Sequence, residues 1–285
     1  MGRERSETVG VRCAPGSVKR MPRSVPPQVI PRPAAWRPGE PAAWAGLALE
    51  QRTGIGIDRV LDALVTVGLR GSVPEGLNSD HLFGLLAPTL VANESGAPAV
   101  HQVNAAVLAV MFEDPDEGEA RLIFTRRSSG LRTHRGEVSF PGGRLDEGEA
   151  PADAARREAH EEVGLDPALV TTVGWIHPVM TMVSSSLILP ILATVAQRPR
   201  LVASPAEVER VFDVTLAELA DPAIFHEERW HIPGRKIPGS ADDSFPVWFF
   251  EVAGEMIWGA TARMIHELLH VVLLRSSGVA GLSGD

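Results

Sequence analysis

The chain has 285 residues, 44% of them apolar and 22% charged, which is ordinary for a globular protein with a sizeable core. Its net charge of −9 argues against non-specific binding to nucleic acid. The single cysteine, Cys13, excludes an intrachain disulfide and favours a reducing compartment. No apolar run approaches the ~20 residues that a membrane helix needs, and the N-terminus lacks the apolar core of a secretory signal. We therefore expect a cytoplasmic protein that binds neither nucleic acid nor membranes.

The first hundred residues divide into two segments of different composition. Residues 1–40 are rich in proline, arginine and serine and show no hydrophobic periodicity, which predicts a disordered leader. A transit peptide is the alternative interpretation of this leader. Residues 41–99 are predicted to form a helical extension and connector, with amphipathic helices broken near Gly54–Gly56 and a short helix near Asp80–Leu86. The extension either packs on the rest of the protein or binds a partner.

The main domain is predicted to span residues 100–276, with a disordered tail at 277–285. Apolar runs predict strands at 103–112, 120–126, 137–140, 170–176, 187–196, 207–214 and 245–252. Helices are expected at about 150–163, at 216–219 and at 258–274. Strands with one central and one terminal helix predict an α/β fold, in which a mixed sheet is sandwiched between helices.

Three glutamates stand close together on the predicted central helix. Glu158, Glu161 and Glu162 occupy positions i, i+3 and i+4, so they share one helix face with Cβ atoms ~5–6 Å apart. They lie in the last turns, where the helix dipole disfavours negative charge, and they repel one another. Arg157 can relieve only Glu161, across i, i+4. A divalent cation that prefers hard oxygen ligands, Mg²⁺ or Mn²⁺, would resolve the conflict, whereas the alternative is a solvated acidic helix end.

The spacing around this helix resembles the Nudix box. The pattern runs Gly143, five residues, Glu149, seven residues, Arg157-Glu158, an aliphatic residue, one residue, Glu161-Glu162, one residue, Gly164 and Leu165. The resemblance implies a Nudix-type α/β/α sandwich that hydrolyses a nucleoside diphosphate linked to another group. It also implies that divalent metal is held by the glutamates of the box.

The resemblance further implies a role for each residue of the box. Glu158 and Glu162, with Glu161 nearby, would hold Mg²⁺ or Mn²⁺, and the cation would neutralise the diphosphate and acidify a bound water. Glu161 is the first choice of catalytic base, and Arg157 would orient it. Glu149 is expected to be a structural anchor. The alternative bases are Glu207, Glu209 and His226.

The segment ahead of the box is similar to the signature of the coenzyme A pyrophosphatase branch of this family. The matching residues are Thr125, Arg127, Ser128, Leu131, Arg132, His134, Gly136, Val138, Phe140, Pro141, Gly142 and Gly143. Trp258-Gly259-Ala260-Thr261-Ala262 resembles the closing helix of the branch. The resemblance implies coenzyme A or acyl-CoA as substrate, with 3′,5′-ADP and 4′-phosphopantetheine as products. It implies substrate binding by Arg127, Arg132, His134, Gly142 and Gly143.

This segment also has a physical interpretation of its own. Its cations, with no acid among them, are Arg126, Arg127, Arg132, His134 and Arg135. Guanidinium groups bind phosphates bidentately, so a cationic loop opposite the glutamates would hold a pyrophosphate. Because Lys19 and Lys236 are the only lysines, a general enrichment in arginine is the alternative explanation.

Two other functions remain open from the sequence. The first is hydrolysis of another nucleoside-diphosphate compound, such as ADP-ribose or NADH. The second is a ligand sensor without catalysis, against which the intact set of glutamates argues. Proteins of this kind often dimerise, so a homodimer is a further expectation.

Overall fold

The computed structural model describes residues 28, 30–73, 102–131, 133–181, 186–234 and 240–275. The strands are β1 (Trp36–Pro38), β2 (Val103–Glu113), β3 (Ala120–Arg127), β4 (Val138–Ser139), β5 (Gly142–Arg144), β6 (Thr171–Trp175), β7 (Val179–Met180), β8 (Leu187–Thr194), β9 (Val208–Thr215), β10 (Phe225–His231), β11 (Ser244–Val252) and β12 (Glu255–Trp258). The helices are α1 (Leu49–Arg52), α2 (Ile57–Thr66), α4 (Pro151–Val163), α5 (Leu216–Leu219) and α6 (Gly259–His270), which continues as a π-helical turn at Val271–Arg275. The predicted helix at Asp80–Leu86 and the tail at 277–285 lie outside the described residues.

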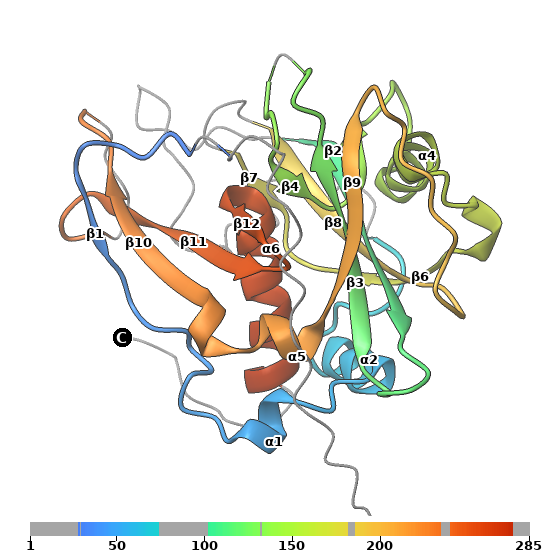
Figure 1. The fold of residues 1–285 in the computed structure, drawn as a ribbon, viewed down its shortest axis with the longest axis horizontal. Coiled ribbons are helices and arrows are strands. Elements are labelled where there is room, and N and C mark those ends of the chain that lie inside the picture. Colours follow the sequence, from blue (N-terminus) through green and yellow to red (C-terminus); the bar gives the residue numbers. More distant parts are fainter. Residues whose placement is uncertain are drawn as a thin grey trace, which may run out of the picture.

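The larger sheet has eight strands and a mixed direction. Its central strand, β2, pairs parallel with β8 and antiparallel with β3 and β5, and β9 pairs with β3. Residues 105–112 of β2 are all buried, because α4 covers one face of the sheet and the other face is packed against α2. In Figure 1, α4 lies on the outer side of this sheet and α6 lies on the inner side. The predicted mixed sheet between helices is confirmed.

A second sheet, which the sequence did not predict, lies on the far side of α6. Its order is β1-β10-β11-β12 (Figure 1). The strand predicted at 245–252 is present as β11, but it is not the last, since β12 follows it after a tight turn at Ala253-Gly254. β10 was missed because its sequence, FHEERWH, is mostly polar. Its charged residues are tolerated because Arg32 bonds the buried carboxylate of Glu228, with Nε 2.9 Å from Oε2.

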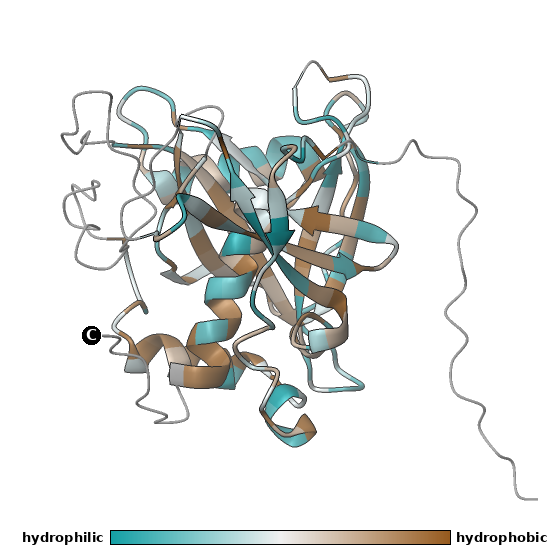
Figure 2. Ribbon diagram, turned by 90° about the vertical axis from the view of Figure 1, so that its left-hand side faces the viewer, coloured by the Kyte–Doolittle hydropathy of each residue, from teal (hydrophilic) through white to brown (hydrophobic). Residues whose placement is uncertain are grey.

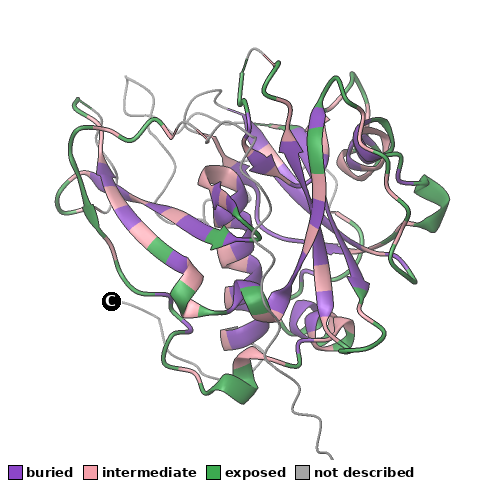
Figure 3. Ribbon diagram, viewed as in Figure 1, coloured by how far each residue is buried: buried purple, intermediate pink, exposed green. Residues whose placement is uncertain are grey.

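Both faces of this second sheet are covered. On the inner face, Phe250 and Phe225 pack with Trp44, whose indole also contacts the ring of His266 on α6. On the outer face, a cluster of Trp230, Phe245, Val247 and Phe249 packs with Ile30 from the N-terminal segment. In Figure 3 buried residues alternate with more exposed ones along β10 and β11, whereas the edge strand β1 is exposed.

The last part of the segment predicted as a disordered leader, residues 1–40, is ordered in the structure. Residues 30–40 are described, and β1 pairs antiparallel with β10, with Trp36 opposite Trp230. Arg32 also lies 4.5 Å from the ring centroid of Trp36. The prediction was wrong here because a three-residue edge strand has no periodicity of its own and gains its partners only in the folded protein.

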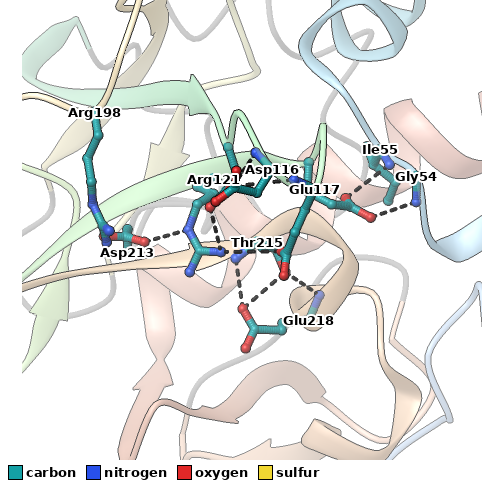
Figure 4. Close-up of polar contacts among 11 residues, drawn as sticks. Gly54, Ile55, Asp116, Glu117, Arg121, Arg198, Asp213, Thr215 and Glu218 are labelled. Atoms are coloured by element: carbon teal, nitrogen blue, oxygen red, sulfur yellow. Dashed lines mark hydrogen bonds and ion pairs between the residues drawn. The ribbon is translucent and has the colours of Figure 1, made fainter. Parts of the chain in front are cut away.

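The helical extension packs into the main core. Ile55, Val60 and Leu64 are fully buried in the cluster that also holds the strands of the larger sheet. The carboxylate of Glu119 accepts the backbone N–H groups of Gly54 and Ile55, at 2.7 and 3.0 Å (Figure 4). Figure 2 shows apolar residues on the inner strands and α6, with hydrophilic residues gathered in loops and exposed turns. No helix in the described ranges has the length and apolar character needed to cross a membrane.

We predict that the chain can be shortened to Gln28 but not to Pro41. A variant that begins at Pro41 lacks Arg32 and β1, so it leaves the buried carboxylate of Glu228 without its arginine, at a cost of about 2 kcal/mol for the lost charge-assisted hydrogen bonds. For a chain of this size that loss lowers Tm by about 4–8 °C. Thermal unfolding of both variants measures the difference. Equal Tm values for the two variants would contradict the assigned role of residues 30–40.

Candidate active site

Helix α4 forms where the sequence predicted it. It begins with Pro151 at its first position, where the missing N–H costs nothing, and ends at Gly164, whose φ of 65° suits glycine. Ala155, Ala159 and Val163 are fully buried against the larger sheet. This small apolar face fixes the rotation of the helix, and the same rotation turns Glu162 toward β5.

Glu162 is a buried acid, with only 3% of its side chain exposed. The backbone N–H of Gly142 donates to Oε2 at 3.3 Å, and Nη1 of Arg127 lies 3.6 Å from Oε1. Gly142 has a φ of 155°, and a Cβ there would overlap the backbone of Ala106 and Val107 on β2. Glycine therefore lets β5 lie directly on β2, which brings the Gly142 N–H to the glutamate.

Glu158 lies beside the next glycine. A Cβ on Gly143 would overlap the carboxylate of Glu158, so this glycine supplies the space that the acid occupies. Nη1 of Arg157 bonds Glu158 Oε1 at 3.0 Å. The sequence assigned Gly142 and Gly143 to substrate binding, and the geometry gives both a direct role in holding the glutamates.

The two acids have perturbed protonation. Burial raises the pKa of Glu162 to about 7. The nearby Arg127 and the Gly142 N–H oppose this rise, and the charges of Glu158 and Glu207 add smaller upward effects. Burial also raises the pKa of Glu158, against the opposing effect of Arg157, while Glu161 and Glu207 add to the rise. These carboxylates therefore affect one another electrostatically, and each ionised form is disfavoured without a compensating cation.

Arg157 forms hydrogen bonds with several residues of the Nudix box. Its guanidinium bonds both oxygens of Glu149, at 2.9 and 3.0 Å, and donates to the backbone carbonyl of Arg144 at 3.0 Å. The hydrogen bonds that Glu149 accepts from Arg157 and from the Asp146 N–H lower the pKa of Glu149. The distance from Nη1 of Arg157 to Oε2 of Glu161 is longer, 3.4 Å. The geometry agrees with an anchoring role for Glu149.

The predicted cationic loop does not face the glutamates as one group. Arg127 reaches Glu162, but Arg126 is buried in ion pairs with Glu255 and Glu209, at 2.5 and 3.4 Å. Successive side chains of a strand point to opposite faces, which sequence proximity alone hides. His134, with a φ of 55°, shares a hydrogen bond with Glu137 at 2.9 Å. Arg132 lies outside the described residues.

The candidate bases occupy different surroundings. Glu161 is 55% exposed and pairs with Arg157, next to the other box glutamates. The segment that holds Glu207 lies next to the site. The Ser128 N–H donates to the Glu207 carbonyl, and the Ser204 N–H donates to the Glu162 carbonyl, both at 2.8 Å. Glu209 pairs with Arg126 as described above. His226 belongs to the second sheet, where its ring stacks on Phe249 at 4.6 Å.

The acids suit a divalent cation that is only partly held by protein. Among the residues that the structure describes, no group of three acidic, histidine or cysteine side chains is close enough to hold an ion by itself. Mg²⁺ is usually bound by one or two carboxylates together with waters and substrate phosphates. The buried Glu162 and the partly buried Glu158 fit that mode, since a cation would relieve the cost of their ionised forms.

The structure is a mixed α/β fold in which an acidic helix end lies beside an arginine. A family model described as NUDIX domain matches residues 102–234. Nudix hydrolase NudL of Escherichia coli K12, named as uncharacterized, is 35% identical over 187 residues, which cover 65% of this chain and 88% of that protein. The chain therefore belongs to the Nudix hydrolase family.

The chain is also similar to a plant protein and to a solved bacterial structure. Nudix hydrolase 22, chloroplastic, of Arabidopsis thaliana is 35% identical over 190 residues, which cover 64% of this chain. The chain spans 60% of the length of that relative. Among solved structures, RenU, a Nudix hydrolase of M. smegmatis, has 26% identity and a TM-score of 0.36, and the match covers 46% of this chain and 81% of RenU.

We predict that Glu162→Gln stabilises the metal-free protein at alkaline pH. A folded pKa of about 7 against 4.5 means that the protonated acid stabilises the fold below pH 4.5 and that this contribution is lost as the pH rises through 7. At 1.36 kcal/mol per unit of pKa the full loss is about 3 kcal/mol, so glutamine should gain about 1–3 kcal/mol at pH 8 and nothing at pH 4.5.

Urea unfolding with a chelator at several pH values from 4.5 to 8 measures this difference. Glu161→Gln, one residue earlier on the same helix but exposed, is the matched control and should leave the pH dependence nearly unchanged. A wild-type pH dependence that persists in Glu162→Gln would contradict the assignment.

Proposed function

We propose that this protein is a divalent-metal-dependent Nudix diphosphatase that cleaves coenzyme A or acyl-CoA to 3′,5′-ADP and 4′-phosphopantetheine. One observation carries the diphosphatase part of the proposal. A buried carboxylate, Glu162, lies 3.6 Å from the guanidinium of Arg127, so a site for a cation and a site for an anion adjoin. A diphosphate with a bound divalent cation would place the cation at the carboxylate and a phosphate oxygen at the guanidinium.

Each residue of the site has a proposed task. Glu162 and Glu158 would hold Mg²⁺ or Mn²⁺, and the bound cation would neutralise phosphate charge and lower the pKa of a water. Arg127 would donate to a phosphate oxygen, which a guanidinium can do bidentately. Arg157 keeps Glu158 and Glu149 in place through its hydrogen bonds. Glu161 would accept the proton of the attacking water at a carboxylate oxygen, with Glu207 as the alternative base.

Coenzyme A is favoured by the residues ahead of the box rather than by the glutamates. The structure gives several signature positions a folding role: Val138 and Phe140 are buried, and Gly136 has a φ of 67°. Arg132 and His134 are, besides Arg127, the charged signature residues that we assign to the substrate. We propose that they contact the diphosphate or the 3′-phosphate, the group that separates CoA from ADP-ribose.

We predict that diphosphatase activity requires added Mg²⁺ or Mn²⁺. Chelation should abolish it, and Glu162→Gln should reduce kcat at least about tenfold, since a loss of about 1.4 kcal/mol in transition-state stabilisation has that effect. Far-ultraviolet circular dichroism confirms that the variant is folded. Full activity after exhaustive chelation would remove the metal from the mechanism.

We predict that CoA is preferred over 3′-dephospho-CoA through Arg132. A charge-assisted hydrogen bond contributes about 1.5–3 kcal/mol, which corresponds to a roughly ten- to hundredfold preference in kcat/KM. Arg132→Ala should remove the preference. Arg135→Ala is the control in the same loop, because Arg135 already donates to the carbonyl of Leu131.

Products are identified by mass spectrometry across CoA, acyl-CoA, ADP-ribose and NADH. Hydrolysis of ADP-ribose but of no CoA compound would exclude the CoA assignment and favour the other nucleoside-diphosphate substrates. Equal losses for CoA and 3′-dephospho-CoA in Arg132→Ala would assign this arginine to the shared diphosphate.

A further inference from the structure

A second buried acid, Glu255, lies beneath the loop that precedes the box. It is the first residue of β12, and only 7% of its side chain is exposed. Its Oε2 lies 2.5 Å from Nη1 of Arg126 on β3, and its Oε1 lies 2.8 Å from Nη1 of Arg210 on β9. One carboxylate of the second sheet therefore joins two neighbouring strands of the larger sheet.

Glycines and a tight turn make this contact possible. Ala253 and Gly254 both have positive φ, 55° and 77°, so β11 returns at once as β12 and places Glu255 at the edge of the hairpin. Gly136 leaves space for the arginine, since a Cβ there would come within 3.2 Å of Nη2 of Arg126. The turn at Ala253-Gly254 and the glycine at position 136 thus leave room for the ion pair of Arg126 and Glu255.

Arg126 is followed directly by the arginine of the candidate active site. Because neighbouring side chains of a strand leave opposite faces, Arg126 reaches Glu255 on one side while Arg127 reaches Glu162 on the other. The pairing of β3 with β9 shifts between them: Arg126 lies opposite Arg210, but Arg127 lies opposite Val208. The backbone ladder is irregular at this point, and such bulges redirect side chains. The ion pair of Arg126 with Glu255 therefore lies at an irregular point of the ladder, one residue before Arg127.

We propose that Glu255 is a positioning residue that holds Arg126 and thereby keeps the guanidinium of Arg127 directed at Glu162. The carboxylate of Glu255 bonds Arg126 and Arg210, so it acts on the site through Arg126. The proposal rests on the proposed function only in that Arg127 serves catalysis.

The chain offers a matched control at the other end of the same two strands. Asp213 on β9 also accepts from two arginines, Arg121 on β3 at 2.5 Å and Arg198 (Figure 4). Its β3 partner in register is Ile123, several residues from Arg127. Asp213→Asn therefore removes a comparable ionic contact between comparable partners without touching the active-site arginine.

The test is a double-mutant cycle on kcat/KM with CoA as substrate. Glu255→Gln should lower kcat/KM roughly tenfold in the wild-type background but less than about twofold in the Arg127→Lys background, because both changes remove the same alignment. Asp213→Asn should change kcat/KM less than about twofold in either background. Losses that multiply for Glu255→Gln, or an equal loss in Asp213→Asn, would overturn the proposal.

Crystal structures of the same variants give a readout that needs no activity. Arg127 should leave Glu162 in Glu255→Gln and stay in Asp213→Asn, whereas an unmoved Arg127 in Glu255→Gln would overturn the proposal. If Glu255→Gln does not fold, Glu255→Asp keeps the charge but shortens its reach, and the same results are expected. A wild-type protein that hydrolyses no nucleoside diphosphate would exclude the proposed function, and the crystallographic result would still decide the role of Glu255.

Discussion

The burial of the Glu162 carboxylate is the constraint on which the rest of the site depends. An ionised acid in this position is disfavoured, and its pKa of about 7 is the consequence of that burial. The fold compensates only in part, with one backbone N–H from Gly142 and an arginine 3.6 Å away. A fold optimised for stability alone would place an apolar residue here, since a buried acid without full compensation lowers stability. The cost is explained if a divalent cation completes the site.

The surrounding elements hold this acid from two directions. Alanines on α4 pack on the larger sheet, Gly142 lets β5 lie directly on β2, and Gly143 leaves the space that the carboxylate of Glu158 fills. From the side, β3 presents Arg127, whose neighbour Arg126 is bound by Glu255 of the second sheet. The second sheet is held in turn by residues 30–38, through Arg32 and β1. Contacts between segments far apart in the sequence thus support the position of the Arg127 guanidinium.

The sequence predicted those features that local pattern determines. The helix at 150–163, its ends at Pro151 and Gly164, and the short helix at 216–219 all follow from spacing and capping residues. The second sheet could not be predicted in the same way, because β10 is polar and gains its stability from Arg32, almost two hundred residues away. The same limit applies to Arg126 and Arg127. Their charges are visible in the sequence, but the face each one takes depends on the register of β3 with β9.

Calorimetric titration of Mn²⁺ into the protein at pH 8, without substrate, tests the central claim most directly. We expect the wild-type protein to bind Mn²⁺ with a rise in its Tm, and Glu162→Gln to bind at least about tenfold more weakly because one ligand charge is lost. Glu161→Gln, at the exposed neighbouring position, should bind Mn²⁺ more tightly than Glu162→Gln does. Equal Mn²⁺ affinity of the wild-type protein and Glu162→Gln would contradict the account.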